Sequence, residues 1–97
     1  MPAVTRKGDL SAGHASFPPT PSTGSSGDVF ADGIGIVRVG DDYAPHGSPT
    51  PSPPHSRNLS AGSSSVYVNG KPLGRIGDVI SCGDTSAQGS STVFAGG

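Results

Sequence analysis

The sequence has 97 residues, a length that fits one small domain. Only 31% of the residues are hydrophobic, Trp is absent, and 16 Gly and 10 Pro make up more than a quarter of the chain, a composition typical of disordered or low-complexity segments. The formal net charge of −1 excludes a global basic field that would attract nucleic acid or an anionic membrane.

No apolar run approaches the roughly 18 residues that indicate a transmembrane helix. The N-terminus also lacks the apolar core of a secretory signal, so we expect neither a signal peptide nor a transmembrane segment. A chain with so few apolar residues usually needs a covalent or metal cross-link. Cys82 is the only cysteine, which excludes a disulfide within the chain and leaves a metal.

The first part of the chain predicts turns and loops. Helical periodicity is absent here and elsewhere, because Gly and Pro interrupt every window long enough for an ordinary helix. Residues 1–14 hold a short apolar start and a first Arg-x-Gly-Asp sequence. Residues 15–28 are rich in Pro and Ser, which predicts a stiff, partly polyproline loop that ends in a turn.

Two later segments predict hairpins of the same layout. Residues 29–41 contain two short apolar stretches joined at Asp32-Gly33, a dipeptide that favours tight hairpin turns. Residues 66–78 repeat this layout 37 residues later, with Asn69-Gly70 at the turn. We interpret the stretch between them, Pro45 to Ser65, as a second Pro-rich loop.

The C-terminal segment Val93–Gly96 repeats the opening strand of these units, and the chain then stops. The missing second half of that unit is present at residues 3–9. We therefore predict a third unit split between the two termini, whose strands lie side by side. A Gly-Ser-Ser run precedes each opening strand and begins at Gly24, Gly62 and Gly89.

Each unit ends in Arg-x-Gly-Asp, and a repeat at fixed spacing argues against disorder. The copies are Arg6–Asp9, Arg38–Asp41 and Arg75–Asp78. We expect the glycines to supply turn conformations closed to other residues. The aspartates are expected to accept hydrogen bonds from local backbone groups, and the arginines to pair with those carboxylates or with carbonyl groups.

A potential metal ligand follows each copy. His14 and His46 come five residues after Asp9 and Asp41, and Cys82 comes four after Asp78. A three-fold axis would bring these three together, and His55 would supply a fourth ligand. Imidazole and thiolate are typical of a closed zinc site, although iron could use the same ligands. The alternative is that these are loop histidines and a free thiol.

Other functions are weaker interpretations of the same residues. Four protein ligands leave zinc no open position for water, so we do not predict an enzyme. A small zinc hydrolase becomes the alternative if His55 is not a ligand. A carbohydrate- or receptor-binding module that uses the Pro-rich loops is a third hypothesis, disfavoured by the small number of aromatic residues, 3 Phe and 2 Tyr.

The sequence resembles the PAAR-repeat proteins. Residues 70–78, Gly-Lys-Pro-Leu-Gly-Arg-Ile-Gly-Asp, are similar to the signature of that family, and the resemblance covers essentially the whole chain. The departures are Leu73-Gly74 in place of Ala-Ala, Ile36-Val37 without the Pro in the second copy, and a looser first copy at Ala3–Arg6.

The resemblance implies an all-β fold with little or no helix. It is a small cone of three-fold pseudosymmetric strand-turn repeats, with one unit closed by the N- and C-termini. We expect a single PAAR-repeat domain over residues 1–97 without extension domains. The family binds zinc near its sharp vertex through three histidines and one cysteine, which implies His14, His46, His55 and Cys82 here.

The resemblance also implies a function without catalysis. Such a cone caps a trimeric β-helical spike, one chain per trimer, and aids piercing of a target cell envelope that it contacts transiently. The spike belongs to a phage tail baseplate in the virion or to a type VI secretion machine assembled in the cytoplasm. Nucleic acid and small-molecule substrates are not expected partners. An open β-helix ends in unpaired backbone groups, which a chain with three similar faces can cover.

Overall fold

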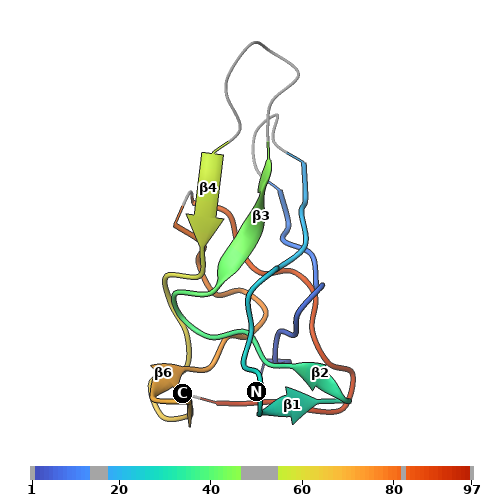
Figure 1. The fold of residues 1–97 in the computed structure, drawn as a ribbon, viewed down its shortest axis with the longest axis vertical. Helices are drawn as coiled ribbons and strands as arrows, with labels where there is room; N and C mark the ends of the chain where they lie inside the picture. The colour runs from blue at the N-terminus through green and yellow to red at the C-terminus, as the bar shows by residue number, and fades with distance from the viewer. Residues whose placement is uncertain (1, 14–17, 47–54, 82, 97) are drawn as a thin grey trace.

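The computed structural model describes residues 2–13, 18–46, 55–81 and 83–96, and of residues 45, 46, 55 and 56 it describes the main chain only. The molecule is a cone of 39 × 23 × 21 Å, with both termini at its broad end (Figure 1). None of the described residues is helical, so this part of the chain offers no helix that could cross a membrane. The predicted all-β class is confirmed.

The strands form three two-stranded antiparallel sheets, β1–β2, β3–β4 and β5–β6. Their bounds are β1 Phe30–Ala31, β2 Ile34–Gly35, β3 Asp42–His46, β4 His55–Asn58, β5 Tyr67–Val68 and β6 Lys71–Pro72. Both predicted hairpins are confirmed, with Asp32-Gly33 and Asn69-Gly70 at the turns. The φ angles of these four residues are 54°, 76°, 54° and 78°, and positive φ at both central positions is what a two-residue type I′ turn requires.

The third unit is split between the termini, as predicted. Ala3 and Phe94 form an antiparallel bridge. The amide of Val4 donates to the carbonyl of Val93 at 3.0 Å, and the amide of Ala95 donates to the carbonyl of Pro2 at 3.0 Å. The two ends of the chain therefore build a strand pair equivalent to β1–β2 and β5–β6.

A ring of three main-chain hydrogen bonds closes the three units around the long axis. Thr5 N donates to Gly74 O (3.0 Å), Gly74 N to Val37 O (2.8 Å) and Val37 N to Thr5 O (3.0 Å). The units approach so closely here that a Cβ on Gly74 would lie 2.9 Å from Val37 O and 2.6 Å from a methyl group of Leu59. A side chain at position 74 would force the ring apart.

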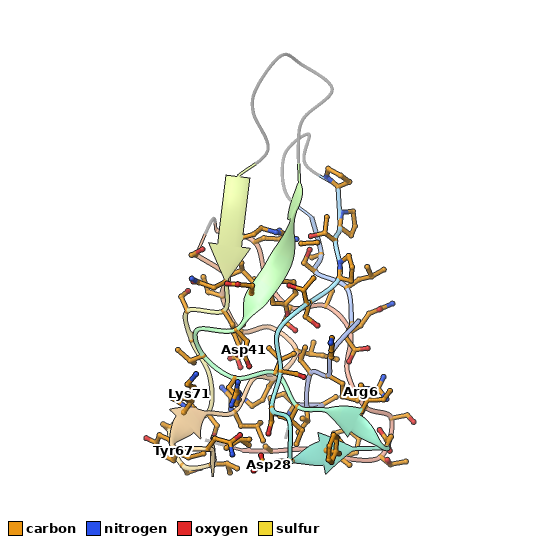
Figure 2. All side chains as sticks on the ribbon, in the orientation of Figure 1. Arg6, Asp28, Asp41, Tyr67 and Lys71 are labelled. Atoms are coloured by element: carbon orange, nitrogen blue, oxygen red, sulfur yellow. The ribbon has the colours of Figure 1, made fainter. Side chains whose placement is uncertain are left out.

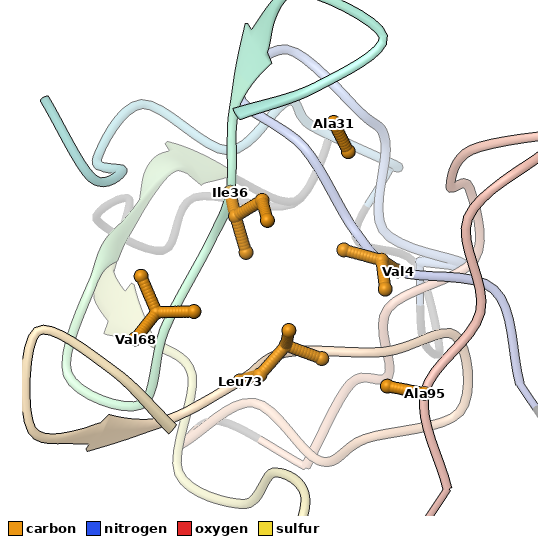
Figure 3. Packing of buried hydrophobic residues seen from close by; sticks show 6 residues of the cluster. All are labelled: Val4, Ala31, Ile36, Val68, Leu73 and Ala95. Atoms are coloured by element: carbon orange, nitrogen blue, oxygen red, sulfur yellow. The ribbon is translucent and has the colours of Figure 1, made fainter. Parts of the chain in front are cut away.

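The three units surround a small apolar core near the broad end, to which each unit contributes two buried side chains (Figure 3). These are Ala31 and Ile36, Val68 and Leu73, and Ala95 and Val4. A second buried cluster consists of Val37, Tyr43, Leu59 and Ile80. Neither cluster is large, which agrees with the low apolar content of the sequence.

The structure differs from the sequence-based interpretation in the segment Pro45 to Ser65, which was expected to be a loop. β4 lies within this segment and pairs with β3. The register shifts by one residue between Tyr43 and His46, and Pro45 lies in this irregular stretch, where a missing amide is tolerated. Neither strand shows the alternation or the β-branched residues by which strands are predicted, so tertiary contacts decide their conformation.

The turn glycines provide a test of the repeated fold. Gly40 has φ 94° with open space around its Cβ position, so Gly40→Ala meets backbone strain but no steric clash. We expect this substitution to lower the free energy of unfolding by about 1–2 kcal/mol. Gly27 also has open space but no positive φ, so Gly27→Ala is the matched control and should be neutral or slightly stabilising. Equal losses in urea unfolding would contradict this explanation.

Candidate functional site

The Arg-x-Gly-Asp sequences form three equivalent clamps. In the second, Asp41 Oδ2 accepts from the amide of Arg38 at 2.8 Å and from its Nε at 2.8 Å, while Nη2 donates to Oδ1 at 2.9 Å. The other two copies repeat these contacts between Arg6 and Asp9 and between Arg75 and Asp78. The glycines have φ of 93°, 94° and 91°. The predicted roles of all three residue types are confirmed.

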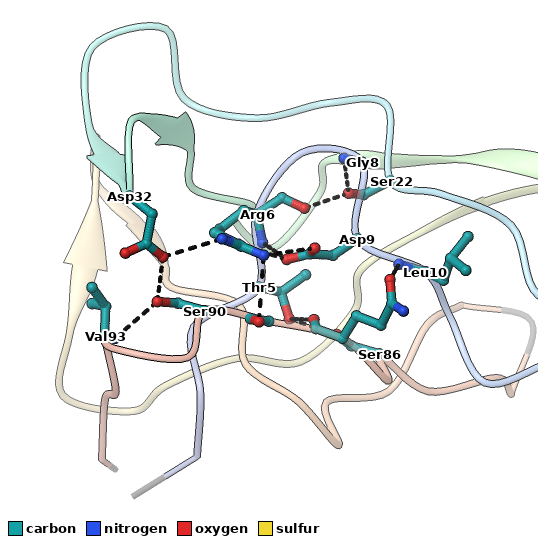
Figure 4. A network of polar contacts seen from close by, with 12 residues as sticks. Thr5, Arg6, Gly8, Asp9, Leu10, Ser22, Asp32, Ser86, Ser90 and Val93 are labelled. Atoms are coloured by element: carbon teal, nitrogen blue, oxygen red, sulfur yellow. Dashed lines mark hydrogen bonds and ion pairs between the residues drawn. The ribbon is translucent and has the colours of Figure 1, made fainter.

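Each clamp also reaches the turn position of the next unit, which in the split third unit is Gly96. Arg6 Nη1 donates to Asp32 Oδ2 at 3.1 Å, as Figure 4 shows. Arg38 Nη1 donates to Asn69 Oδ1 at 3.0 Å. Arg75 Nη1 donates to Gly96 O at 3.1 Å. The units therefore bind one another in a closed cycle at the broad end.

Three buried serines bind the same turn positions. Ser26 donates to Asn69 Oδ1 at 2.7 Å, Ser63 donates to Gly96 O at 2.7 Å, and Ser90 donates to Asp32. Each hydroxyl also accepts from the amide three residues later, at the start of the opening strand, at 2.9 Å. The Gly-Ser-Ser runs of the sequence contain these three serines. The equivalent residues are the serines and not the first glycines, because Ser63 and Ser90 directly follow Gly62 and Gly89, whereas Ser26 comes two residues after Gly24.

Hydrogen bonding shifts the pKa of two clamp arginines and of the aspartate in the first hairpin turn. The hydrogen bond to Asp9 raises the pKa of Arg6, and the hydrogen bond to Asp41 raises the pKa of Arg38. Hydrogen bonds from Ser90 and Thr92 lower the pKa of Asp32, and the charge of Arg6 lowers it further. These shifts favour the charged forms of Arg6, Arg38 and Asp32.

The broad end exposes an aromatic residue at the same position of each unit. Phe30, Tyr67 and Phe94 are 55%, 57% and 48% exposed. Figure 2 shows Tyr67 and Lys71 at this end of the molecule. Val66, Val93 and Ile34 are also exposed. Exposed large apolar side chains that repeat with the symmetry of the fold mark this end as a candidate contact surface.

Nearer the narrow end, the structure contains an ion pair that the sequence analysis did not predict. Arg57 Nη1 lies 2.6 Å from Asp84 Oδ2, and the two side chains are 0% and 1% exposed. Arg57 also donates to the hydroxyl groups of Ser11, at 2.8 Å, and Thr20. It lies 5.6 Å from the centre of the Tyr43 ring. Neither charge belongs to a repeated motif, and a lone Arg and a lone Asp in distant segments of the sequence give no signal that they pair.

Asp84 connects three segments of the chain. Its carboxylate binds Arg57 and accepts from the amide of Gly13 at 3.1 Å and from the amide of Thr85 at 2.7 Å. Burial alone raises the pKa of Asp84, but the hydrogen bonds from Arg57 and from the backbone amides outweigh it and leave the pKa below its ordinary value.

The structure places only part of the predicted metal site. His46 and His55 are directly opposite one another as the last pair of β3 and β4, toward the narrow end of the cone (Figure 1). His14 and Cys82, and the side chains of His46 and His55, lie outside the described residues. Among the side chains that are described, no three His, Cys, Asp or Glu residues are grouped to hold a metal.

The described neighbours of the predicted ligands are joined through Asp84. Gly13 precedes His14, Arg57 is two residues after His55, and Asp84 is two residues after Cys82. Both Gly13 and Arg57 donate to the Asp84 carboxylate. Three of the four predicted ligands, His14, His55 and Cys82, are therefore within two residues of Asp84 or of a residue that donates to its carboxylate.

Comparison with known proteins identifies the family. The family model described as "PAAR motif" matches residues 12–88, which is more than half of the chain. The chain belongs to the PAAR motif family. This membership supports a spike-tip role in type VI secretion.

Two curated relatives, both from Pseudomonas aeruginosa, share the motif region. One is the NAD(P)(+) glycohydrolase toxin Tse6 of strain PAO1, and the other is the (p)ppApp synthetase toxin Tas1 of strain UCBPP-PA14. Each is 34% identical over an alignment of 87 residues, which covers 81% of this chain and 20% of the relative. The chain thus spans about a fifth of the length of these toxins.

The buried ion pair predicts a strong stability effect. Asp84→Ala leaves the Arg57 charge buried without its carboxylate, so we expect a loss of about 3–5 kcal/mol in the free energy of unfolding. Asp28→Ala removes an exposed carboxylate that accepts hydrogen bonds from Ser26 and Asn69, and it is the matched control, with a loss below about 1 kcal/mol. Chemical denaturation at neutral pH measures both, and similar losses would contradict the assigned role of Asp84.

The same pair sets a pH dependence. The pKa of Asp84 is lower in the folded chain than in the unfolded chain, so its contribution is complete above the ordinary pKa of Asp and is lost as the pH falls through the folded value. Acid titration of Asp84→Ala should therefore show a smaller loss of stability below about pH 4 than the unmodified chain. Identical acid transitions would contradict this assignment.

Proposed function

We propose that this chain is the tip of a type VI secretion spike, whose broad end caps a trimeric β-helical spike with one chain per trimer. The narrow end then faces the target envelope and aids its piercing. Membership of the PAAR motif family supports this placement. As part of such a spike, the chain would contact the envelope only transiently.

The observation that carries this proposal is the closed three-fold arrangement of a single chain. Three units repeat the same clamp, the same core positions and the same contact with the next unit. A single chain of this kind offers three similar faces to a partner, and a trimer has three identical faces to match. The exposed aromatic residues Phe30, Tyr67 and Phe94 repeat with the same symmetry and supply apolar area for the contact.

We assign no catalytic role to this chain. The part shared with the relatives is the PAAR motif, which covers a fifth of those toxins. Their named activities, NAD(P)(+) glycohydrolase and (p)ppApp synthetase, are stated for the relatives as whole proteins. A structural role for the motif is consistent with ligands that close a metal site rather than leave it open.

A single structural zinc ion held by His14, His46, His55 and Cys82 is part of the proposal. The donor set suits zinc, and the main chain supports the site, because His46 and His55 are opposite one another and the Asp84 carboxylate joins segments next to the other ligands. When bound, the ion would cross-link the chain segments that meet at the narrow end.

The metal proposal predicts about one equivalent of zinc per chain in protein purified without added metal. Cys82→Ser and His46→Ala should each lose most of this zinc and melt at a lower temperature, because each removes one of four ligands. Asp42→Asn changes an exposed carboxylate on the same strand as His46 and should keep its zinc. Elemental analysis and thermal melts measure these effects. Absence of metal, or two metal ions per chain, would overturn the closed four-ligand site.

The spike proposal predicts binding to a soluble trimeric β-helical spike fragment at one chain per trimer. A double variant, Phe30→Ser with Phe94→Ser, should bind at least roughly tenfold more weakly, because both side chains are large and exposed in the repeated positions. Ile76→Ser changes an exposed apolar residue outside these positions and is the control. Calorimetry gives affinity and stoichiometry. No binding by the unmodified chain, or three chains per trimer, would overturn the proposal.

A further inference from the structure

The outer strand of each hairpin unit has no neighbouring strand on its second side within the described residues. β1 and β5 each belong to a two-stranded sheet. In Figure 1, β1 lies below β2, at the outermost level of the broad end. The inner strands are instead joined to the next unit. The contacts are Lys7 N to Gly35 O (2.8 Å), Val39 N to Pro72 O (2.9 Å) and Ile76 N to Ala3 O (2.9 Å).

Antiparallel pairing determines which main-chain groups face outward on the free edge. Hydrogen-bonded and non-hydrogen-bonded residue pairs alternate along such a pair of strands. In the third unit, Val93 and Ala95 are both hydrogen-bonded to the inner strand, and Phe94 lies between them, opposite Ala3. The N–H and C=O of Phe94 therefore point away from the inner strand, and neither bonds another described residue.

Phe30 and Tyr67 occupy the same position in the other two units. Phe30 is opposite Gly35, and Tyr67 is opposite Pro72. The preceding residues accept from the inner strand, with Ile36 N to Val29 O at 3.1 Å and Leu73 N to Val66 O at 3.0 Å. By the same alternation, each of these aromatic residues presents one N–H and one C=O on the outer edge.

We propose that these three edges bind three strands of a trimeric β-helical spike by main-chain hydrogen bonds, so that the cone continues the sheets of the spike. This inference rests on the proposed function. Its chemistry is the addition of a partner strand to an exposed sheet edge. A spike that ends in three identical strand edges presents the complementary unpaired groups, and it fills all three edges at once, whereas one extended peptide fills one.

Main-chain recognition also explains how a single chain can match a symmetric trimer. The three units share their backbone pairing but differ in side chains. Ile34 and Lys71, for example, occupy the same position, beside the turns of the first and second units. Contacts made by N–H and C=O groups are insensitive to this difference, so the edges are more alike than the side chains around them.

The inference is tested at one edge by comparing Tyr67→Pro with Tyr67→Ala. Both substitutions remove the ring, but only proline removes the outward N–H, which has no bond to lose within the described chain. Binding to a soluble trimeric β-helical spike fragment should be roughly tenfold weaker for the proline variant than for the alanine variant. Thermal melts check that both variants fold. Equal affinities would overturn the inference.

A second measurement needs no substitution. Amide hydrogen exchange of Phe30, Tyr67 and Phe94, followed by NMR, should be fast in the free chain and at least roughly tenfold slower in the spike complex. The amide of Ile36 is already hydrogen-bonded within its unit and is the internal control. A bound complex in which the three amides stay unprotected contradicts strand addition and leaves spike capping intact. A chain that does not bind the spike overturns the proposed function itself.

Discussion

The ring of three main-chain hydrogen bonds among Thr5, Val37 and Gly74 is the constraint on which the rest of this fold depends. Each of the three residues donates to one neighbour and accepts from the other, so the backbone at the axis is satisfied without a sheet. This closure fixes how near the units lie. It leaves space for only two buried side chains from each unit, and these include alanine at two of the six positions.

Because the apolar core is so small, polar contacts between the units must supply much of the stability of the fold. Each arginine of the repeated clamps binds its own aspartate and the turn position of the next unit, and a buried serine binds the same position. Bidentate pairs of arginine and carboxylate are among the stronger polar contacts in proteins. Because the contacts form a cycle, the loss of one unit removes partners from both others.

The two ends of the cone are built from different chemistry. At the broad end, the strands are short, regular and three-fold related, with exposed aromatic residues and free strand edges. Toward the narrow end of the described structure, the three-fold symmetry is lost, because the strand pair β3–β4 extends along the axis. The buried Arg57–Asp84 ion pair has no equivalent in the other units among the described residues.

The sequence by itself determined the repeat, the two turns at Asp32-Gly33 and Asn69-Gly70, the unit split across the termini and the roles of the clamp residues. These follow from local chemistry, because a positive φ, a short hairpin and an Arg-Asp contact three residues apart depend on neighbours in the chain. The four ligand positions were predicted from the repeat and the family resemblance, and they remain a prediction.

Only the tertiary structure decided the pairing of β3 with β4, the Arg57–Asp84 ion pair and the outward-facing edges at the broad end. Arg57 and Asp84 are 27 residues apart and carry no repeated pattern, so their contact depends on how β4 packs against the distant segment that contains Asp84. The β3–β4 pair has weak local strand preference and is fixed by the contacts around it. In each case the deciding interaction joins segments that are distant in the chain, and composition, periodicity and spacing do not record such contacts.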